Sequence, residues 1–162
     1  MDSQTKSELY HMYQSYKREL WKYTGESYES QLKEWFDDLL TDHSMTFRPV
    51  RDASRNVLIG FFVVQKLNKE QEAECGCKWF ISEAYILPSC RKRGFMTAIV
   101  HDFITSNKGN IGLVTIDKNT GATKFWEDTL GSIGYSKEKI PHLGNRIVSF
   151  YRFKMPVLAA TR

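Results

Sequence analysis

Apolar residues in the N-terminal part of the chain recur at helical spacing in two separate stripes. The first stripe consists of Leu9, Met12, Tyr13, Tyr16, Leu20 and Tyr23, and the second of Tyr28, Leu32, Trp35, Phe36, Leu39 and Leu40. Positions i, i+3 and i+4 share one face of a helix, so each stripe predicts an amphipathic helix. Gly25 is expected to end the first helix, and Thr24 or Ser27 to cap the second. Residues 1–44 are therefore predicted to form a helical part.

After residue 44 the pattern becomes that of β-strands. Strands are predicted at 45–51, 57–67 and 78–87, with a turn at 52–56. Residues 57–64 are apolar at nearly every position, which indicates a central strand covered on both faces. The polar stretch 68–74 shows no periodicity and is predicted to be a hairpin loop.

Helices and strands alternate in the second half of the chain. The predicted elements are a helix at 95–106, a strand at 111–116, a helix at about 122–130, a short strand that starts with 134–136, a loop at 141–145, a strand at 146–154 and a loose tail at 156–162. A strand–helix–strand unit of this length makes its two strands parallel. The whole order predicts a single α+β domain over 1–162, with a mixed, mostly antiparallel central sheet and helices on both faces.

Composition and charge exclude some classes of protein. The chain has 162 residues and a net charge of +4. This charge suits an anionic ligand, but the chain lacks the basic stripe that is typical of a nucleic-acid-binding protein. No apolar run approaches the ~20 residues that span a bilayer. Cys75 and Cys77 lack a second pair of ligands for zinc, so no metal site is predicted. We expect a cytoplasmic protein that binds neither nucleic acid nor membrane.

The stretch 83–96 carries the strongest chemical signal. A strand ends at Pro88, which has no N–H to continue a ladder, and a basic loop at 91–93 leads through Gly94 into the helix that begins at Phe95. A helix N-terminus offers unpaired N–H groups and the positive end of the macrodipole. The junction therefore suits a phosphate or pyrophosphate. A solvated basic loop that merely caps a helix is the alternative.

This stretch resembles the signature of the GCN5-related N-acetyltransferases. In that family an Arg/Gln-x-x-Gly-x-Gly/Ala loop opens a helix and binds the pyrophosphate of acetyl-CoA. Here Arg91 and Gly94 match the first two motif positions, and Met96 stands where Gly or Ala is usual. A second block is also similar, and it consists of Asn119, Ala122, Phe125-Trp126 and Gly134-Tyr135. The element order matches from about residue 9 to residue 154.

The resemblance implies an acetyl-CoA site. It places at this co-substrate Ile86, Leu87, Arg91, Lys92, Arg93, Gly94, Phe95, Met96, Asn119, Phe125 and Trp126. Backbone groups near Ile86 and Leu87 would pair with the pantetheine arm, and one N–H would polarise the thioester carbonyl. Asn119 has a helix cap as its alternative role.

Two residues are predicted to be catalytic. Transfer to an amine needs a neutral nitrogen, so a general base is expected, and Glu83 is the only acid in its strand segment. Its alternative is a structural Glu that pairs with a cation. Trp126 occupies the position where many family members have a tyrosine acid, so Tyr135, Tyr151 or water would protonate the CoA thiolate instead, with aromatic packing as the alternative for both tyrosines. Cys90 at the phosphate end is not expected to form an acyl-enzyme.

The leading hypothesis is an N-acetyltransferase that moves the acetyl group of acetyl-CoA to a primary amine by direct attack in a ternary complex. The competing hypothesis is a non-catalytic acyl-CoA-binding module of the same fold. Met96 and Trp126 favour the second reading, because both depart from the family pattern. The acceptor is expected to be a small-molecule amine or a protein amine, and a homodimer is left open.

Overall fold

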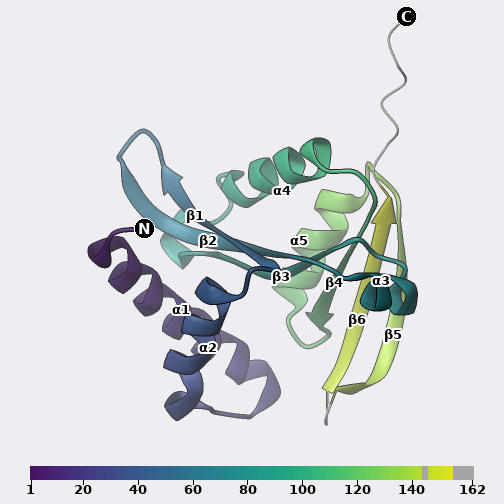
Figure 1. The fold of residues 1–162 in the computed structure, drawn as a ribbon, viewed down its shortest axis with the longest axis horizontal. Helices are drawn as coiled ribbons and strands as arrows, with labels where there is room; N and C mark the ends of the chain where they lie inside the picture. The colour runs from purple at the N-terminus through teal and green to yellow at the C-terminus, as the bar shows by residue number, and fades with distance from the viewer. Residues whose placement is uncertain (144–145, 155–162) are drawn as a thin grey trace, which may run out of the picture.

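The computed structural model describes residues 1–143 and 146–154 and contains one six-stranded sheet (Figure 1). The strands are β1 (Met45–Asp52), β2 (Val57–Lys66), β3 (Trp79–Ile86), β4 (Asn110–Ile116), β5 (Tyr135–Leu143) and β6 (Arg146–Lys154). Their order in the sheet is β1-β2-β3-β4-β6-β5. Among the strands of the described residues, the β3–β4 pair is parallel, as the strand–helix–strand unit predicts, and the other pairs are antiparallel.

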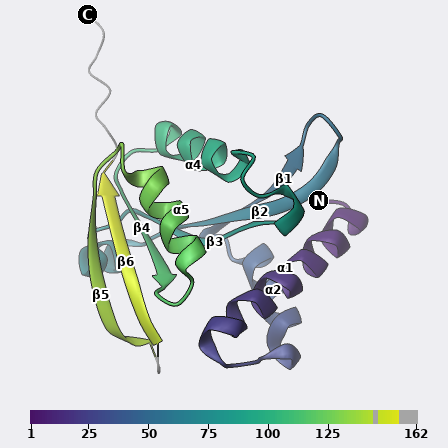
Figure 2. The same cartoon turned by 180° about the vertical axis from the view of Figure 1, so that it is seen from behind.

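Helices cover both faces of the sheet, which confirms the predicted α+β fold class (Figures 1 and 2). The helices are α1 (Ser3–Thr24), α2 (Leu32–Thr41), α3 (Lys69–Cys75), α4 (Phe95–Ser106) and α5 (Thr120–Leu130). Helices α1 and α2 bury their apolar stripes against one face around Phe61, and α4 and α5 pack on the other face around Phe62. The continuous apolar run of β2 is thus explained, because neighbouring side chains enter different cores.

The two central strands separate halfway along their length. Strand β3 pairs with β4 only from Trp79 to Ile81, whereas it pairs with β2 as far as Ile86. In the same region Val63 faces Glu83 while Val64 faces Ile81, so Ser82 is an extra residue that forms a bulge. The C-terminal half of β3 therefore has one edge without a partner strand.

Several predicted elements are wrong in detail. The predicted hairpin loop at 68–74 is largely helix α3, because Asn68 and Gln71 form a capping box at its start. The predicted loop at 141–145 is partly strand, since β5 continues to Leu143; its register shifts after Ile140, and an edge strand tolerates Pro141 there. Residues 144–145 and the predicted tail at 156–162 lie outside the described residues.

The ends of the N-terminal helices are predicted only in part. Gly25 does end α1, in the left-handed conformation at φ 73°. The caps predicted for the second helix are wrong: a 3-10 turn at Glu29–Gln31 leads into α2, and neither Thr24 nor Ser27 caps it. Across residues 1–143 and 146–154, no helix is long and apolar enough to cross a membrane, and no three potential metal ligands gather in one place.

Candidate active site

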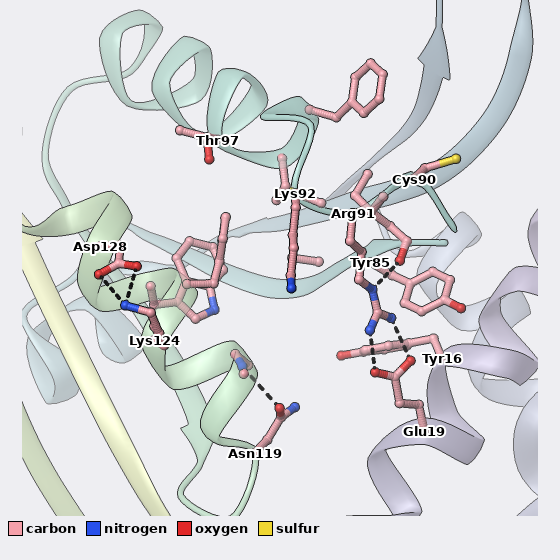
Figure 3. Close-up of a pocket in the computed structure, with 18 of the residues that line it drawn as sticks. Tyr16, Glu19, Tyr85, Cys90, Arg91, Lys92, Thr97, Asn119, Lys124 and Asp128 are labelled. Carbon is pink, nitrogen blue, oxygen red and sulfur yellow. Dashed lines mark hydrogen bonds and ion pairs between the residues drawn. The ribbon is translucent and has the colours of Figure 1, made fainter. Parts of the chain in front are cut away.

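A cavity of about 530 Å³ opens where β3 loses its β4 partner (Figure 3). Its walls come from α1, the C-terminal half of β3, the loop before α4, the first turn of α4 and the start of α5. Segments far apart in the sequence therefore meet here. Of the residues predicted at the co-substrate, the cavity is lined by Ile86, Arg91, Lys92, Arg93, Gly94, Phe95, Met96, Asn119, Phe125 and Trp126.

The first turn of α4 presents free backbone donors to this cavity. Gly94 is the N-cap residue at φ 80°, and no side chain among residues 1–143 and 146–154 caps the helix. The left-handed backbone at this position favours glycine. The first N–H groups of a helix have no intrahelical acceptor, so those that follow Gly94 are available to an anion.

The three adjacent cations of the loop differ in what they contact. Arg91 pairs with Glu19 of α1 through two bonds of 2.8 and 2.7 Å, and its Nε donates to the Ile86 carbonyl at 2.9 Å. The bond to Glu19, more than the opposing burial, raises the pKa of Arg91. Arg93 pairs with Asp52 at 3.2 Å. Both guanidinium groups are thus held by carboxylates of the protein itself.

Lys92 is the exception in this loop. Its backbone is left-handed at φ 60°, and its ammonium group points into the cavity (Figure 3). No carboxylate in the described part of the chain pairs with it. An unpaired ammonium beside an open helix N-terminus suits a phosphate-bearing ligand.

Apolar side chains form the wall beside the phosphate end. The Phe125 and Trp126 rings meet edge to face at 5.0 Å, and Trp126 is buried. Met96, in the first turn of α4, packs in the core at 8% exposure and also contributes to the cavity lining. Asn119 caps α5, because its Oδ1 accepts from the Ala122 N–H at 3.1 Å, and it also lines the cavity.

The predicted base Glu83 does not line this cavity. Its carboxylate accepts hydrogen bonds from the Tyr16 hydroxyl and from Lys17 Nζ, the latter at 2.6 Å, and its side chain is 13% exposed. The alternative drawn from the sequence, a Glu paired with a cation, is therefore present in the structure. Tyr16, which holds this carboxylate, does line the cavity (Figure 3).

Three other predicted residues lie outside the cavity lining. Tyr135 borders a separate hollow with Arg152 and packs 5.5 Å from the Tyr151 ring. Tyr151 in turn donates to Glu127 at 3.4 Å. Leu87 packs toward the core of α1 and α2, and its N–H donates to the Ile59 carbonyl at 2.8 Å.

Tyr16, Glu19 and Lys124 line the cavity but are absent from the sequence prediction. Tyr16 belongs to the apolar stripe of the first helix, so its spacing marks it as a core residue. Glu19 and Lys124 are charged positions on amphipathic helices, where a solvated face is the usual reading. No local signal distinguishes them, because their roles depend on which strand the helices meet.

The features of the cavity suit acetyl-CoA as a ligand. It combines a helix N-terminus without a cap, one unpaired ammonium and an aromatic wall. Successive residues of a strand direct their backbone groups to opposite sides. Since the Leu87 N–H donates toward β2, the Ile86 N–H points to the edge that β4 has left. A thioester carbonyl could receive a hydrogen bond there.

Comparison with known proteins agrees with this reading. A sequence model described as the acetyltransferase (GNAT) family matches residues 7–131. No curated protein gave a significant match.

Solved structures share the fold at low sequence identity. The spermidine N-acetyltransferase of Vibrio cholerae, in complex with CoA and spermine, is 15% identical with a TM-score of 0.66, over 96% of this chain and 92% of that one. A Corynebacterium glutamicum structure, titled as histone acetyltransferase HPA2 and related acetyltransferase, is 12% identical with a TM-score of 0.68, over 99% and 96%. Arabidopsis thaliana NAA60 with a bisubstrate analogue is 19% identical with a TM-score of 0.50, over 74% and 79%.

The family predicted from the sequence motifs is confirmed, and with it the prediction of an enzyme that uses acetyl-CoA as co-substrate. The match spans most of the chain and includes the loop, α4 and α5 that form the cavity. The chain belongs to the acetyltransferase (GNAT) family, whose members are acetyl-CoA-dependent N-acetyltransferases.

Proposed function

We propose that the protein transfers the acetyl group of acetyl-CoA to a primary amine by direct attack in a ternary complex. The observation that supports this proposal best is the cavity itself, which joins an uncapped helix N-terminus and Lys92 at one end to Tyr16, Glu19, Leu20 and Tyr23 of α1 at the other. One space of this kind holds the co-substrate and admits a second substrate beside it.

Direct attack places charge at two points. The carbonyl oxygen of the thioester gains negative charge, and the Ile86 N–H on the unpaired edge of β3 is the donor that we assign to it. The attacking nitrogen gains positive charge and must lose a proton. Glu83 remains the predicted destination of that proton.

The leaving thiolate has no assigned acid in this proposal. Tyr135, predicted for that role, borders a different hollow from the cavity. Trp126, at the position of the tyrosine usual in the family, has an indole N–H that does not act as an acid. We therefore propose that water protonates the thiolate or that it leaves unprotonated.

The acceptor is proposed to be a small-molecule amine or a protein N-terminus. The similar Vibrio cholerae structure holds spermine, and NAA60 holds a bisubstrate analogue. Carboxylates that would attract a polyamine line the cavity at Glu19 and Asp128, but Arg91 and Lys124 already pair with them. Because both carboxylates are already paired, they do not favour a polyamine over other primary amines as the acceptor.

We also make a proposal on the domain organisation of the chain and on its cellular compartment. We propose that residues 1–162 act as a single cytoplasmic domain in which the N-terminal helices close the acceptor side of the cavity. The Glu19–Arg91 pair supports this reading, since it ties α1 to the loop before α4.

The test is CoA release from acetyl-CoA in the presence of a panel of polyamines, arylalkylamines and peptides with free N-termini. Calorimetric binding of acetyl-CoA is measured in parallel. Release with at least one amine, and acetylation of that amine by mass spectrometry, supports the proposal. Tight binding of acetyl-CoA with no release for any acceptor would instead support a non-catalytic binding module.

A further inference from the structure

We propose that Tyr16 of α1 is the catalytic residue that faces the acceptor amine, with Glu83 and Lys17 as positioning residues behind it. This inference rests on the function proposed above. It is carried by the placement of the three side chains: Tyr16 lines the cavity, and neither Glu83 nor Lys17 does.

Both oxygens of the Glu83 carboxylate accept hydrogen bonds, and Glu83 itself does not line the cavity. One of its oxygens accepts a hydrogen bond from the Tyr16 hydroxyl, and the other accepts one from Lys17 Nζ at 2.6 Å. Both members of the Lys17–Glu83 pair are largely buried, at 15% and 13% side-chain exposure. A substrate in the cavity thus reaches this carboxylate through the Tyr16 hydroxyl.

The Tyr16 ring is fixed in place by its neighbours. It packs edge to face on Phe61 at 5.6 Å and lies 5.5 Å from the Tyr85 ring of β3. The Lys17 ammonium lies 5.2 Å from the Tyr16 ring centroid. The hydroxyl therefore has a defined direction toward Glu83, and its lone pairs are left to accept a proton from the cavity.

Charges around the hydroxyl keep it in its neutral form. Burial and the Glu83 carboxylate raise the pKa of Tyr16 well above its ordinary value, with smaller contributions from Tyr13 and Glu19. Lys17, which lies on the same helix as Tyr16, pairs with Glu83, and Arg91 pairs with Glu19. Tyr16 thus carries its proton throughout the neutral range and can donate it to Glu83.

A proton passes from the amine through Tyr16 to Glu83 as the acetyl group is transferred. The neutral amine forms a C–N bond to the acetyl carbon, which leaves positive charge on nitrogen and negative charge on oxygen. Tyr16 Oη takes the proton from that nitrogen as its own proton moves to Glu83. The carbonyl re-forms, the C–S bond breaks and CoA leaves as the thiolate. Glu83 then returns its proton through Tyr16 to water.

The test compares Tyr16→Phe, Glu83→Gln and the double variant with the best amine of the panel. Each single change should lower kcat by about 100-fold or more with acetyl-CoA binding retained, as expected for loss of acid–base catalysis. The double variant should be about as slow as either single one, because two groups of one relay do not add. Tyr13→Phe is the matched control, since it removes from the same helix a hydroxyl that is not hydrogen-bonded to Glu83 and does not line the cavity, and its kcat should stay within about two-fold.

A second measurement separates a catalytic from a structural role. A fluorinated tyrosine at position 16 keeps the ring but lowers its hydroxyl pKa, so the basic limb of the pH–rate profile should move to lower pH. An active wild type whose Tyr16→Phe variant keeps most of its kcat, or whose fluorinated variant has an unmoved profile, overturns the relay alone. A wild type that releases no CoA with any amine overturns the relay and the proposed function together.

Discussion

At the scale of single residues, neighbouring side chains of the same type have different partners. Arg91, Lys92 and Arg93 are three consecutive cations, and although Arg91 matches the family motif, their charge alone offers no reason to rank them. The structure pairs Arg91 with Glu19 and Arg93 with Asp52, and it leaves Lys92 directed into the cavity. Charge that is already neutralised contributes less to anion binding than charge that is not.

Lys92→Ala should weaken acetyl-CoA binding by about ten-fold, since one charge-assisted contact to phosphate is lost. Arg93→Ala, in the same loop, is the matched control and should weaken binding less, because Asp52 already neutralises that guanidinium. Calorimetric titration at low and moderate salt measures both. Equal losses for the two variants would contradict the ranking.

Asn119→Ala should lower the free energy of unfolding by about 1 kcal/mol, because it removes the side chain that caps α5. Asn119→Asp retains an acceptor at this position and should keep most of the stability. Urea unfolding of the three proteins gives the comparison. If both variants bind acetyl-CoA like the wild type, the cap is the whole role of Asn119.

At the scale of elements, the cavity depends on how β3 leaves β4 while it stays on β2. The bulge at Ser82 turns Glu83 toward α1, and the strand pairing with β2 continues to Ile86. Gly60 of β2 lies opposite Ile86, and a Cβ on it would meet the Tyr85 carbonyl oxygen at 2.0 Å. The close approach of β2 and β3 at the cavity thus requires glycine.

Gly60→Ala should destabilise the protein by about 1–3 kcal/mol, because the new methyl group overlaps rigid backbone. Gly121→Ala is the contrasting control, since that residue lies in α5 and its nearest new contact is 3.8 Å away. Alanine favours a helix over glycine by about 1 kcal/mol, so this variant should be as stable as the wild type or more so. Thermal unfolding distinguishes the two.

Elements with a regular spacing of apolar residues could be predicted from the sequence. Elements that depend on a capping hydrogen bond or on pairing with another strand could not. The apolar spacing of residues 95–106 marks α4 to its ends. Helix α3 has no buried residue, so periodicity misses it, although the Asn68–Gln71 capping box is visible in the sequence. Strand β5 continues to Leu143, into the loop predicted at 141–145, because β6 pairs with it, and no local sequence pattern records such a pairing.

At the scale of the whole molecule, the site joins segments that are distant in sequence. Tyr16 and Glu83 are 67 residues apart, and Arg91 is 72 residues from Glu19. Most of the residues predicted at the co-substrate do line the cavity, and the loop and helix that carry many of them are continuous in the sequence. The α1 side of the cavity depends on how α1 packs on the sheet, so its residues could not be predicted from spacing.

Stability should fall as the pH drops below about 4, the ordinary range for carboxyl groups. Several carboxyl groups have a lowered pKa in the folded protein, among them Asp52, whose pKa is lowered first by Ser54 and further by Arg93. A lowered folded-state pKa adds stability above the unfolded pKa, and this stability is lost as the pH falls through the folded value. Asp52→Asn should flatten the acid limb of a plot of unfolding free energy against pH, and an unchanged slope would contradict the assignment.

The Glu19–Arg91 pair has a consequence for how the two substrates of the proposed ternary complex would affect each other's binding. The pair fastens helix α1 to the loop before α4, and both segments line the cavity. We expect that a ligand that orders the loop would also order the helix, so a second ligand beside α1 would lose less conformational entropy on binding. By linkage this effect would be mutual: the amine would strengthen CoA binding by the same factor as CoA strengthens amine binding.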